Sequence, residues 1–327
     1  MEKSKKYFAG VLLLVTGMLF IIFWHYLPVE VGGQRPGNIY MLIFYNAFIA
    51  FTVAALFTAF LIAVSKRAYI AEHFAGFKRF RHLLLLMIKR DFVTRYRRSV
   101  LGVLWSLLNP LLTMLVLTMV FSTVFEFDIE YFPLYLLSGQ LIFNFFSEST
   151  TLAMSSIING ASTIKKVYVP KYLFPTSRVL SSLVNLGFSL LAFMIVFFIL
   201  RAPSHITMLL IPLPIIYIVV FSMGVGMFLS AMAVFFRDVS YIYGILTTLL
   251  MFMTPIFWPV AILPARVYHL IHLNPMFHFV TYFRDVALYG NVPGLWANII
   301  CIGFALAALG VGVYVKMAQQ DKYILYL

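Results

Sequence analysis

The stretch Lys78–Pro110, KRFRHLLLLMIKRDFVTRYRRSVLGVLWSLLNP, determines how the rest of this chain is organised. It is basic at first and becomes purely apolar near Val100. Read as a helix, its first part has one row of apolar and aromatic side chains at four-residue spacing, Leu84, Ile88, Phe92 and Tyr96. Most of the cations lie away from that row. We therefore predict an amphipathic helix in the membrane interface, which leads directly into a spanning segment over Leu101–Phe125.

The composition identifies the class of protein. The chain has 327 residues, of which 63% are hydrophobic and 11% charged, and its mean hydropathy is +0.97. Soluble domains carry roughly 25% charged residues, so this composition indicates an all-α polytopic membrane protein. The single cysteine, Cys301, lies in an apolar run and excludes an intrachain disulfide. The sequence has no Cys or His metal box and no phosphate loop, so we expect no cofactor and no nucleotide hydrolysis by this chain alone.

The apolar runs predict about eight transmembrane helices. Their expected ranges are 7–26, 39–64, 101–125, 132–158, 176–200, 206–236, 240–258 and 293–315. We predict three parts: an N-terminal two-helix extension over residues 1–66, a cytoplasmic amphipathic interface helix over 67–100, and a six-span core over 101–327.

The positions of the lysines and arginines predict the orientation. All but Arg35, Arg201, Arg266 and Arg284 of the 24 cations fall in segments that are cytoplasmic if the N-terminus is inside. Both termini are therefore expected in the cytoplasm, in the cytoplasmic (inner) membrane. The net charge of +13 then reflects membrane topology and contact with membrane lipids, and no nucleic acid is expected as a partner.

The loop NGASTIKKVYVPKYLFP, Asn159–Pro175, is a candidate contact for a soluble protein. Asn159 and Gly160 can end a helix, and two prolines bracket a short amphipathic piece that carries two lysines. A short helix on the cytoplasmic face suits docking of a partner. The alternative is an ordinary positively charged inside loop.

Polar and aromatic side chains of the second core span form a candidate transport path. Gln140, Asn144 and Glu148 follow one another at four-residue spacing, in one row of a helix. A carboxylate inside a span is costly and is a functional candidate, although interhelical hydrogen bonding is the alternative. Aromatic residues near the outer face, Phe132 and Tyr135 among them, belong either to an aromatic belt or to a pathway on which sugar rings stack.

The section 259–292 holds two apolar pieces that are too short to span, roughly Ala265–Leu273 and Met276–Tyr289. We interpret them as short re-entrant helices that close the outer mouth of a channel. Arg284 and Asp285 are expected to anchor the second piece where headgroup water solvates them. Its histidines have no metal-binding spacing and are interpreted as interfacial.

Four motifs in order resemble a known family. The first is KRDFVTRYRRSVLGVLWSLLNPLL, Lys89–Leu112, and the loop at Asn159 is the second. FFRDV at Phe235 follows, and then TPIFWPVAILP with LNPMFHFVTYFRDVALYG. Together they resemble the permease subunits of polysaccharide-exporting ABC transporters, which export O-antigen, teichoic acid or capsule. The resemblance covers about Lys78–Met317.

The resemblance implies a homodimer of six-span subunits above two copies of a separate nucleotide-binding ATPase, which would hold ATP and Mg. It also implies an interface helix, a cytoplasmic coupling helix at Asn159–Lys171 and external gate helices. The two spans before Lys66 are additional to the usual six, and the resemblance assigns them no role.

Three groups of residues follow from the two lines of reasoning. The expected ATPase-coupling residues are Arg90, Arg95, Arg97, Arg98, Asn159, Lys165, Lys166, Tyr168, Pro170, Lys171, Arg237 and Asp238. The expected translocation path comprises Phe132, Tyr135, Gln140, Asn144 and Glu148. The expected external gate comprises Trp258, Asn274, Pro275, Phe279, Tyr282, Phe283 and Arg284. No catalytic or metal-binding residue is expected.

We therefore interpret the chain as the channel-forming subunit that lets a lipid-linked polysaccharide cross the membrane when partner ATPases close on ATP. One alternative is a related exporter of drugs or lipids. A second is a membrane enzyme that acts on polyprenyl-linked sugars, which would need clustered carboxylates, whereas the 11 acidic residues here are scattered. A third is a membrane scaffold, which would not need the re-entrant pair.

Overall fold

The computed structural model describes residues 67–97, 101–124, 129–166, 169–263 and 271–319. Within these ranges the chain is helical and has no strand. The chain divides into two compact units after Arg79, and the description below concerns the second, Phe80–Leu327. Several predictions lie outside the described residues: the first two spans, Arg98, Tyr168 and most of the first gate piece. The predicted domain boundaries stay a prediction.

The described helices follow the predicted apolar runs closely. They are α3 (Arg67–Tyr96), α4 (Leu104–Val124), α5 (Phe132–Asn159), α6 (Ala161–Ile164), α7 (Leu173–Ile199), α8 (Pro212–Phe235), α9 (Val239–Met253), α11 (Pro275–Ala287) and α12 (Leu295–Gln319). Short 3₁₀ turns occur at Ile206–Leu210 and Val260–Ile262. Five stretches, carried by α4, α5, α7, the Ile206–Phe235 run and α12, are long and apolar enough to cross a membrane. The described part is therefore that of a multi-pass membrane protein.

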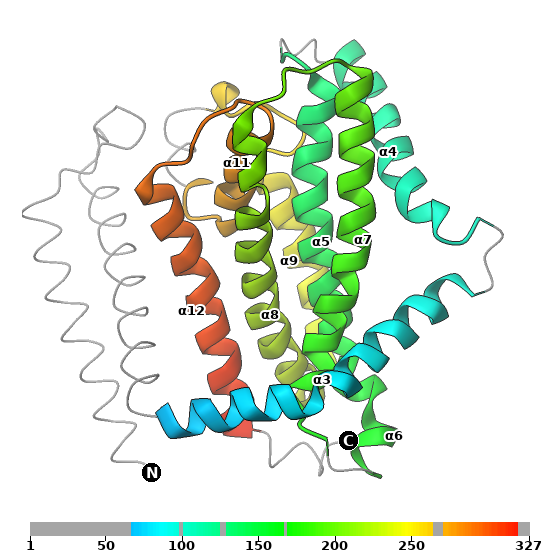
Figure 1. The fold of residues 1–327 in the computed structure, drawn as a ribbon, viewed down its shortest axis with the longest axis vertical. Helices are drawn as coiled ribbons and strands as arrows, with labels where there is room; N and C mark the ends of the chain where they lie inside the picture. Colours follow the sequence, from blue (N-terminus) through cyan, green and yellow to red (C-terminus); the bar gives the residue numbers. More distant parts are fainter. Residues whose placement is uncertain (1–66, 98–100, 125–128, 167–168, 264–270, 320–327) are drawn as a thin grey trace, which may run out of the picture. The chain divides into compact units, whose positions relative to one another are not determined.

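The core of the bundle is built around α5. Figure 1 shows α8 between α12 and α5, with α7 and α4 on the other side of α5. The most apolar 18-residue window of α5 is 61% buried, whereas that of α4 is 6% buried. The helix α5 carries polar side chains such as Gln140, Ser149 and Thr150, which are buried. Polar side chains within a span are stabilised by contact with protein instead of lipid, which is consistent with the central position of α5. The helix α4 is peripheral.

The closest helix pair, α8 with α12, packs through glycine. A Cβ atom on Gly224 would overlap the backbone of Ala308, and one on Gly312 would overlap the carbonyl of Gly224. Small residues let two helix backbones approach closely, and in a membrane this van der Waals contact is a main source of helix association. Glycine at these positions therefore determines the spacing of α8 and α12.

The predicted span Ser240–Trp258 is wrong at its end. The helix α9 stops at Met253, and at ~1.5 Å per residue its 15 residues reach about 22 Å, short of the ~30 Å hydrocarbon core. Pro255 explains the stop, because proline lacks an N–H and disfavours helical geometry in the preceding residue. The residues from Thr254 to Trp258 continue as irregular chain.

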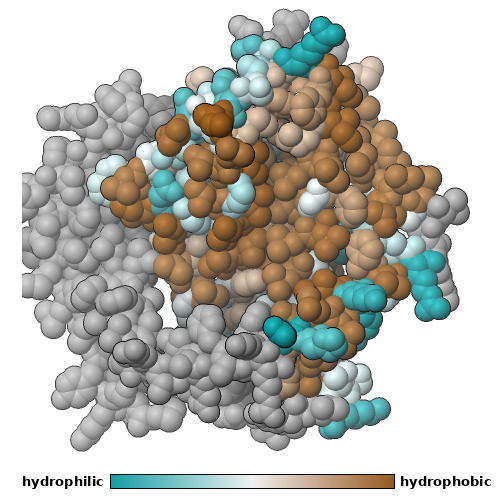
Figure 2. Space-filling model, in the orientation of Figure 1, coloured by the Kyte–Doolittle hydropathy of each residue, from teal (hydrophilic) through white to brown (hydrophobic). Residues whose placement is uncertain are grey.

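The surface of the bundle is consistent with a membrane environment. On the face drawn in Figure 2, apolar side chains cover the middle of the described bundle, and polar ones gather toward its two ends. Large apolar side chains of α4, such as Val116 (62% exposed) and Met119 (74% exposed), are open. In a soluble monomer so large an apolar surface would be exceptional.

Candidate functional site

The end of α3 is held to the bundle by polar side chains. Asp91 accepts from Arg178 of α7 at 2.9 Å, and Ser181 of the same helix donates to the same carboxylate oxygen at 3.4 Å. The exposed Arg90 reaches the other carboxylate oxygen at 3.5 Å. One helical turn later, Arg95 Nη1 lies 2.5 Å from Glu148 Oε1 of α5. The interface helix is thus ion-paired to two helices of the bundle.

A hydrogen-bonded chain extends this network. Asn185 of α7 donates through Nδ2 to Glu148 Oε1 at 2.7 Å. The hydroxyl of Tyr96 donates to Asn185 Oδ1 at 2.8 Å and also contacts Ser106 Oγ of α4. The network therefore joins α3, α4, α5 and α7. We call Asp91, Arg95, Tyr96, Ser106, Glu148, Arg178, Ser181 and Asn185 the elbow network.

The structure brings together two residues that sequence analysis assigned to different roles. Arg95 was expected to contact an ATPase, and Glu148 was expected in the transport path, yet the two form an ion pair. Of the network, sequence analysis missed six members as functional candidates: Asp91, Tyr96, Ser106, Arg178, Ser181 and Asn185. A signal for the α7 members was present, since Arg178, Ser181 and Asn185 are spaced three and four residues apart on one helix face.

The short helix α6 shares an apolar cluster with α3. Met87 of α3 belongs to a buried cluster with Ile157, Phe174, Ala231 and Val234, against which Ile164 of α6 packs. A Cβ on Gly160 would lie 2.5 Å from the ring of Phe174, so only glycine lets the chain turn here at this distance. The lysines that follow, Lys165 and Lys166, are exposed.

The remaining expected coupling residues lie, like α6, in or next to the segments that join α5 to α7 and α8 to α9, or on α3 or directly after it. Asn159, Arg237 and Asp238 are exposed, as are Arg90 and Arg97, whereas Pro170 and Lys171 are half-buried. Beside them, Lys316 Nζ lies 4.3 Å from the centre of the Tyr172 ring. Burial raises the pKa of the Tyr172 hydroxyl, so that group stays protonated at neutral pH. This surface carries cations and few carboxylates.

The polar row of α5 does not share one environment. Gln140 is buried, and its Oε1 has no hydrogen-bond partner among the described residues. Asn144 is exposed, and Glu148 is half-buried in the elbow network. Phe132 and Tyr135 stack on each other and are buried. Within one protomer, therefore, these five residues do not line a common open surface.

At the opposite end, Arg284 corrects the expectation of a solvated anchor. Its side chain is 3% exposed, and it donates to Ser138 Oγ at 3.1 Å, Pro255 O at 2.7 Å and Tyr135 O at 3.0 Å. Its guanidinium carbon lies 3.5 Å from the centre of the Tyr135 ring. The break after α9 explains this burial, because irregular backbone inside a bundle needs donors for its carbonyls.

Other side chains support the same break. Tyr135 donates to the carbonyl of Trp258 at 2.8 Å, and Asn274 Nδ2 donates to Thr254 Oγ1 at 2.9 Å. Asn274 also caps α11, since its Oδ1 accepts from the N–H of Met276, and Pro275 occupies the first turn, where proline is favoured. The expected gate residues thus join α11 to α5 and to the chain that follows α9.

The aromatic side chains of α11 point into the protein. Phe279 and Phe283 are fully buried, with ring centres 5.3 Å from Phe221 and 5.6 Å from Phe193. Tyr282 donates to Asn298 Oδ1 at 2.9 Å. The second gate piece is therefore present as a helix, packed on α7, α8 and α12. Its role as a gate stays a prediction.

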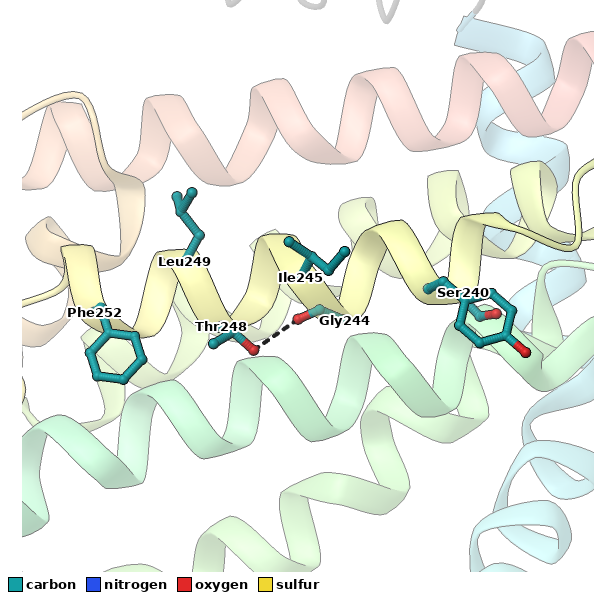
Figure 3. Close-up of a pocket in the computed structure, with 7 residues that line it drawn as sticks. Ser240, Gly244, Ile245, Thr248, Leu249 and Phe252 are labelled. Carbon is teal, nitrogen blue, oxygen red and sulfur yellow. Dashed lines mark hydrogen bonds between the residues drawn. The ribbon is translucent and has the colours of Figure 1, made fainter.

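A shallow hollow runs along the exposed side of α9. Ser240, Tyr241, Gly244, Ile245, Thr248, Leu249 and Phe252 line it. Figure 3 shows Ile245 and Leu249 projecting from the same side of the helix, and Thr248 donates to the carbonyl of Gly244 at 3.0 Å. Tyr243, by contrast, is buried and contacts Thr150 of α5 through its hydroxyl. No group of His, Cys, Asp or Glu side chains in the described ranges could hold a metal ion.

Comparison with known proteins identifies the family. The model of the ABC-2 type transporter membrane family matches residues 82–288, which run from the second half of α3 to the end of α11. The chain belongs to the ABC-2 type transporter family. The match covers more than half of the chain and includes the elbow network, α6 and the Arg284 cluster.

Individual relatives of this ABC-2 chain are polysaccharide transport proteins. It is 27% identical over 245 residues to an O-antigen export system permease protein of Klebsiella pneumoniae, covering 74% of this chain and 95% of that protein. An O-antigen export system permease protein of Myxococcus xanthus is 30% identical, covering 65% of this chain and 83% of that protein. A polysialic acid transport protein of Escherichia coli is 23% identical, covering 72% and 92%. The ABC-2 chain therefore spans nearly the full length of these relatives.

Proposed function

We propose that this ABC-2 chain is the membrane permease subunit of an ATP-driven exporter that moves a polysaccharide, of O-antigen or capsule type, across the cytoplasmic membrane. The observation that carries the proposal is the near full-length similarity to export permeases of such polysaccharides. It favours this function over export of drugs or lipids and over a membrane enzyme. The glycan is proposed to be lipid-linked.

The proposal includes a separate ATPase as the source of energy. The surface around α6 suits such a partner, because exposed lysines directly follow a short helix whose apolar residue Ile164 packs in the same cluster as α3. A push on α6 then reaches α3 through one packed cluster, without a flexible link. We assign the described charged residues of the expected set to this contact or to its support: Arg90, Arg95, Arg97, Lys165, Lys166, Lys171, Arg237 and Asp238.

A second copy of the chain is part of the proposal. Within one protomer the proposed path residues do not form an open channel, since Phe132, Tyr135 and Gln140 are buried. A polysaccharide path therefore needs a further surface, and two copies with two ATPases supply one at a shared axis. Both termini are proposed to lie in the cytoplasm, which puts α6 at the cytoplasmic end and α11 at the outer end.

Export by a reconstituted complex tests the proposal. The chain is co-expressed with its partner ATPase and purified, and the complex is incorporated into vesicles together with a lipid-linked polysaccharide. We expect ATP-dependent appearance of the glycan on the side of the membrane opposite the ATPase. A complex that hydrolyses ATP in response to apolar drugs and never moves the glycan would contradict the proposal.

A further inference from the structure

The two ion pairs that hold the end of α3 differ in their access to water. In the Asp91–Arg178 pair the side chains are 10% and 25% exposed, and Ser181 also donates to Asp91. In the Arg95–Glu148 pair they are 36% and 32% exposed. Each acid also accepts a hydrogen bond from α7, so the difference between the pairs lies in their exposure. Water screens an open ion pair, so it contributes little, while a shielded pair is harder to separate. The Arg95–Glu148 contact is the one that opens more easily.

Glu148 keeps a partner when Arg95 leaves. Asn185 Nδ2 donates to the same oxygen, Oε1, at 2.7 Å. A half-buried carboxylate that lost every partner would be strongly unfavourable, but here the amide of α7 still satisfies it. Separation of α3 from α5 therefore leaves α5 and α7 joined and leaves no buried polar atom of this carboxylate without a donor.

The end of α3 is linked to a helix that is free to follow it. Tyr96 contacts Ser106, at the start of α4. Its hydrogen bond to Asn185 of α7 breaks when the α3 end swings, while its contact with Ser106 is kept. In the apolar membrane-spanning part of α4, 6% of the residues are buried inside the protomer, compared with 61% for α5. Within the protomer, few packing contacts oppose a tilt of α4, whereas α5 is fixed in the core. A swing of the α3 end therefore moves α4 relative to α5.

We propose that the Arg95–Glu148 pair is a releasable latch between the interface helix and α5, and that the Asp91–Arg178 pair is the pivot about which the α3 end swings. Asn185 and Tyr96 are positioning residues: the first satisfies Glu148 in the open state, and the second carries the movement to α4. The inference rests on the proposed function in one respect, which is that a partner ATPase drives α3.

Distance measurements with the latch intact test the proposal. In a Cys301→Ser background, spin labels are placed at Thr94→Cys and Thr151→Cys, two exposed positions beside Arg95 and Glu148. The full complex with its ATPase is measured without nucleotide and after trapping with ATP and vanadate. We expect the distance to lengthen on trapping by about 5 Å, roughly one turn of helix rise.

A second label pair reports on the pivot. Lys89→Cys on α3 and Leu191→Cys on α7 are both exposed, and each lies on a helix that the Asp91–Arg178 pair joins. We expect this distance to change much less than the first. An unchanged Thr94–Thr151 distance overturns the latch, and an equal change in both pairs overturns the pivot.

Charge variants separate a latch from a static anchor. Glu148→Gln should lengthen the Thr94–Thr151 distance without nucleotide and lower export per ATP hydrolysed by roughly three- to fivefold. The exchange Arg95→Glu with Glu148→Arg should restore both. The control Lys89→Gln, which removes one exposed charge from α3 outside the pair, should change neither. A Glu148→Gln variant that only loses thermal stability, with a normal export-to-ATP ratio, contradicts the latch.

Measuring export together with the label distance distinguishes failure of the latch from failure of the proposed function. A complex that exports polysaccharide with an unchanged Thr94–Thr151 distance overturns the latch and supports the proposed function. A complex that shows the nucleotide-dependent distance but moves no polysaccharide supports the latch and contradicts the proposed substrate.

Discussion

At the scale of single residues, Arg284 shows how a buried cation can serve the backbone. Its guanidinium donates to the carbonyls of Tyr135 and Pro255 and to the hydroxyl of Ser138. The planar guanidinium offers several donors in fixed directions, which an ammonium does not. Gly139 belongs to the same arrangement, because a Cβ there would lie 2.8 Å from Arg284 Nη2.

Replacement of Arg284 should therefore destabilise the bundle. Arg284→Ala removes four buried hydrogen bonds, to Ser138, Tyr135, Pro255 and Ile256. A hydrogen bond from a charged donor contributes about 1.5–3 kcal/mol, so we expect a fall of several degrees in the unfolding temperature of the detergent-solubilised protein. Arg284→Lys should recover only part of the loss. The exposed Arg81→Ala is the control and should have little effect. Equal unfolding temperatures for Arg284→Ala and the native chain would contradict this role.

The aromatic residues of α11 allow a second prediction at this scale. Phe279→Ala and Phe283→Ala each remove a fully buried ring and should cost about 3–5 kcal/mol of stability, measured by thermal unfolding. Phe252→Ala, at a position 61% exposed, is the control and should cost much less. Ion leak in vesicles, measured on the folded fraction without ATP, then tests the gate role. If neither variant raises the ion leak, α11 contributes to packing and does not close the channel.

At the scale of elements, α6 and α3 contact one shared apolar cluster, to which Met87 and Ile164 contribute. If α6 docks on an ATPase, Lys165→Glu with Lys166→Glu should lower export per ATP severalfold while leaving membrane insertion unchanged, because repulsion at a contact changes affinity more than folding. Both side chains are exposed, so the fold does not depend on them. Export and ATP hydrolysis are measured on the same vesicles. Normal coupling in the double variant would leave these lysines as a topology signal only.

The contact between α8 and α12 gives a prediction with a control on the same helix. Gly312→Ala should destabilise the protein, because its Cβ would overlap the carbonyl of Gly224. Gly310→Ala should be neutral or stabilising by up to ~1 kcal/mol, since nothing lies within 4 Å of its Cβ and alanine is the better helix former. Thermal unfolding of the two variants in detergent measures the difference. A similar effect for both would mean that α8 and α12 separate readily.

At the scale of the whole molecule, thiol labelling of intact cells tests the proposed orientation of the chain in the membrane. In a Cys301→Ser background, an impermeant thiol reagent should label Glu130→Cys, which is exposed between α4 and α5. It should not label Lys166→Cys, because the cations near α6 are expected in the cytoplasm. Permeabilised cells are the control, in which both positions should react. Labelling of Lys166→Cys in intact cells would reverse the topology and with it the assignment of α6 to an ATPase.

The sequence alone determined the class of this protein, most of its spans and its family resemblance. Long apolar runs predicted α4, α5, α7, α8 and α12 because a membrane span has a fixed minimum length and must satisfy its own backbone. The amphipathic pattern of Lys78–Tyr96 likewise predicted α3, since periodicity is a local property of the chain.

Only the tertiary structure decided which polar groups meet. Arg95 and Glu148 lie 53 positions apart in the chain and Arg284 and Tyr135 lie 149 apart, so no local pattern predicts either contact. The burial of Arg284 and the end of α9 at Met253 belong together, because the broken helix needs donors that a distant helix supplies. Exposure of each charge, and hence the strength of each ion pair, depends on how the helices pack, and the sequence does not record it.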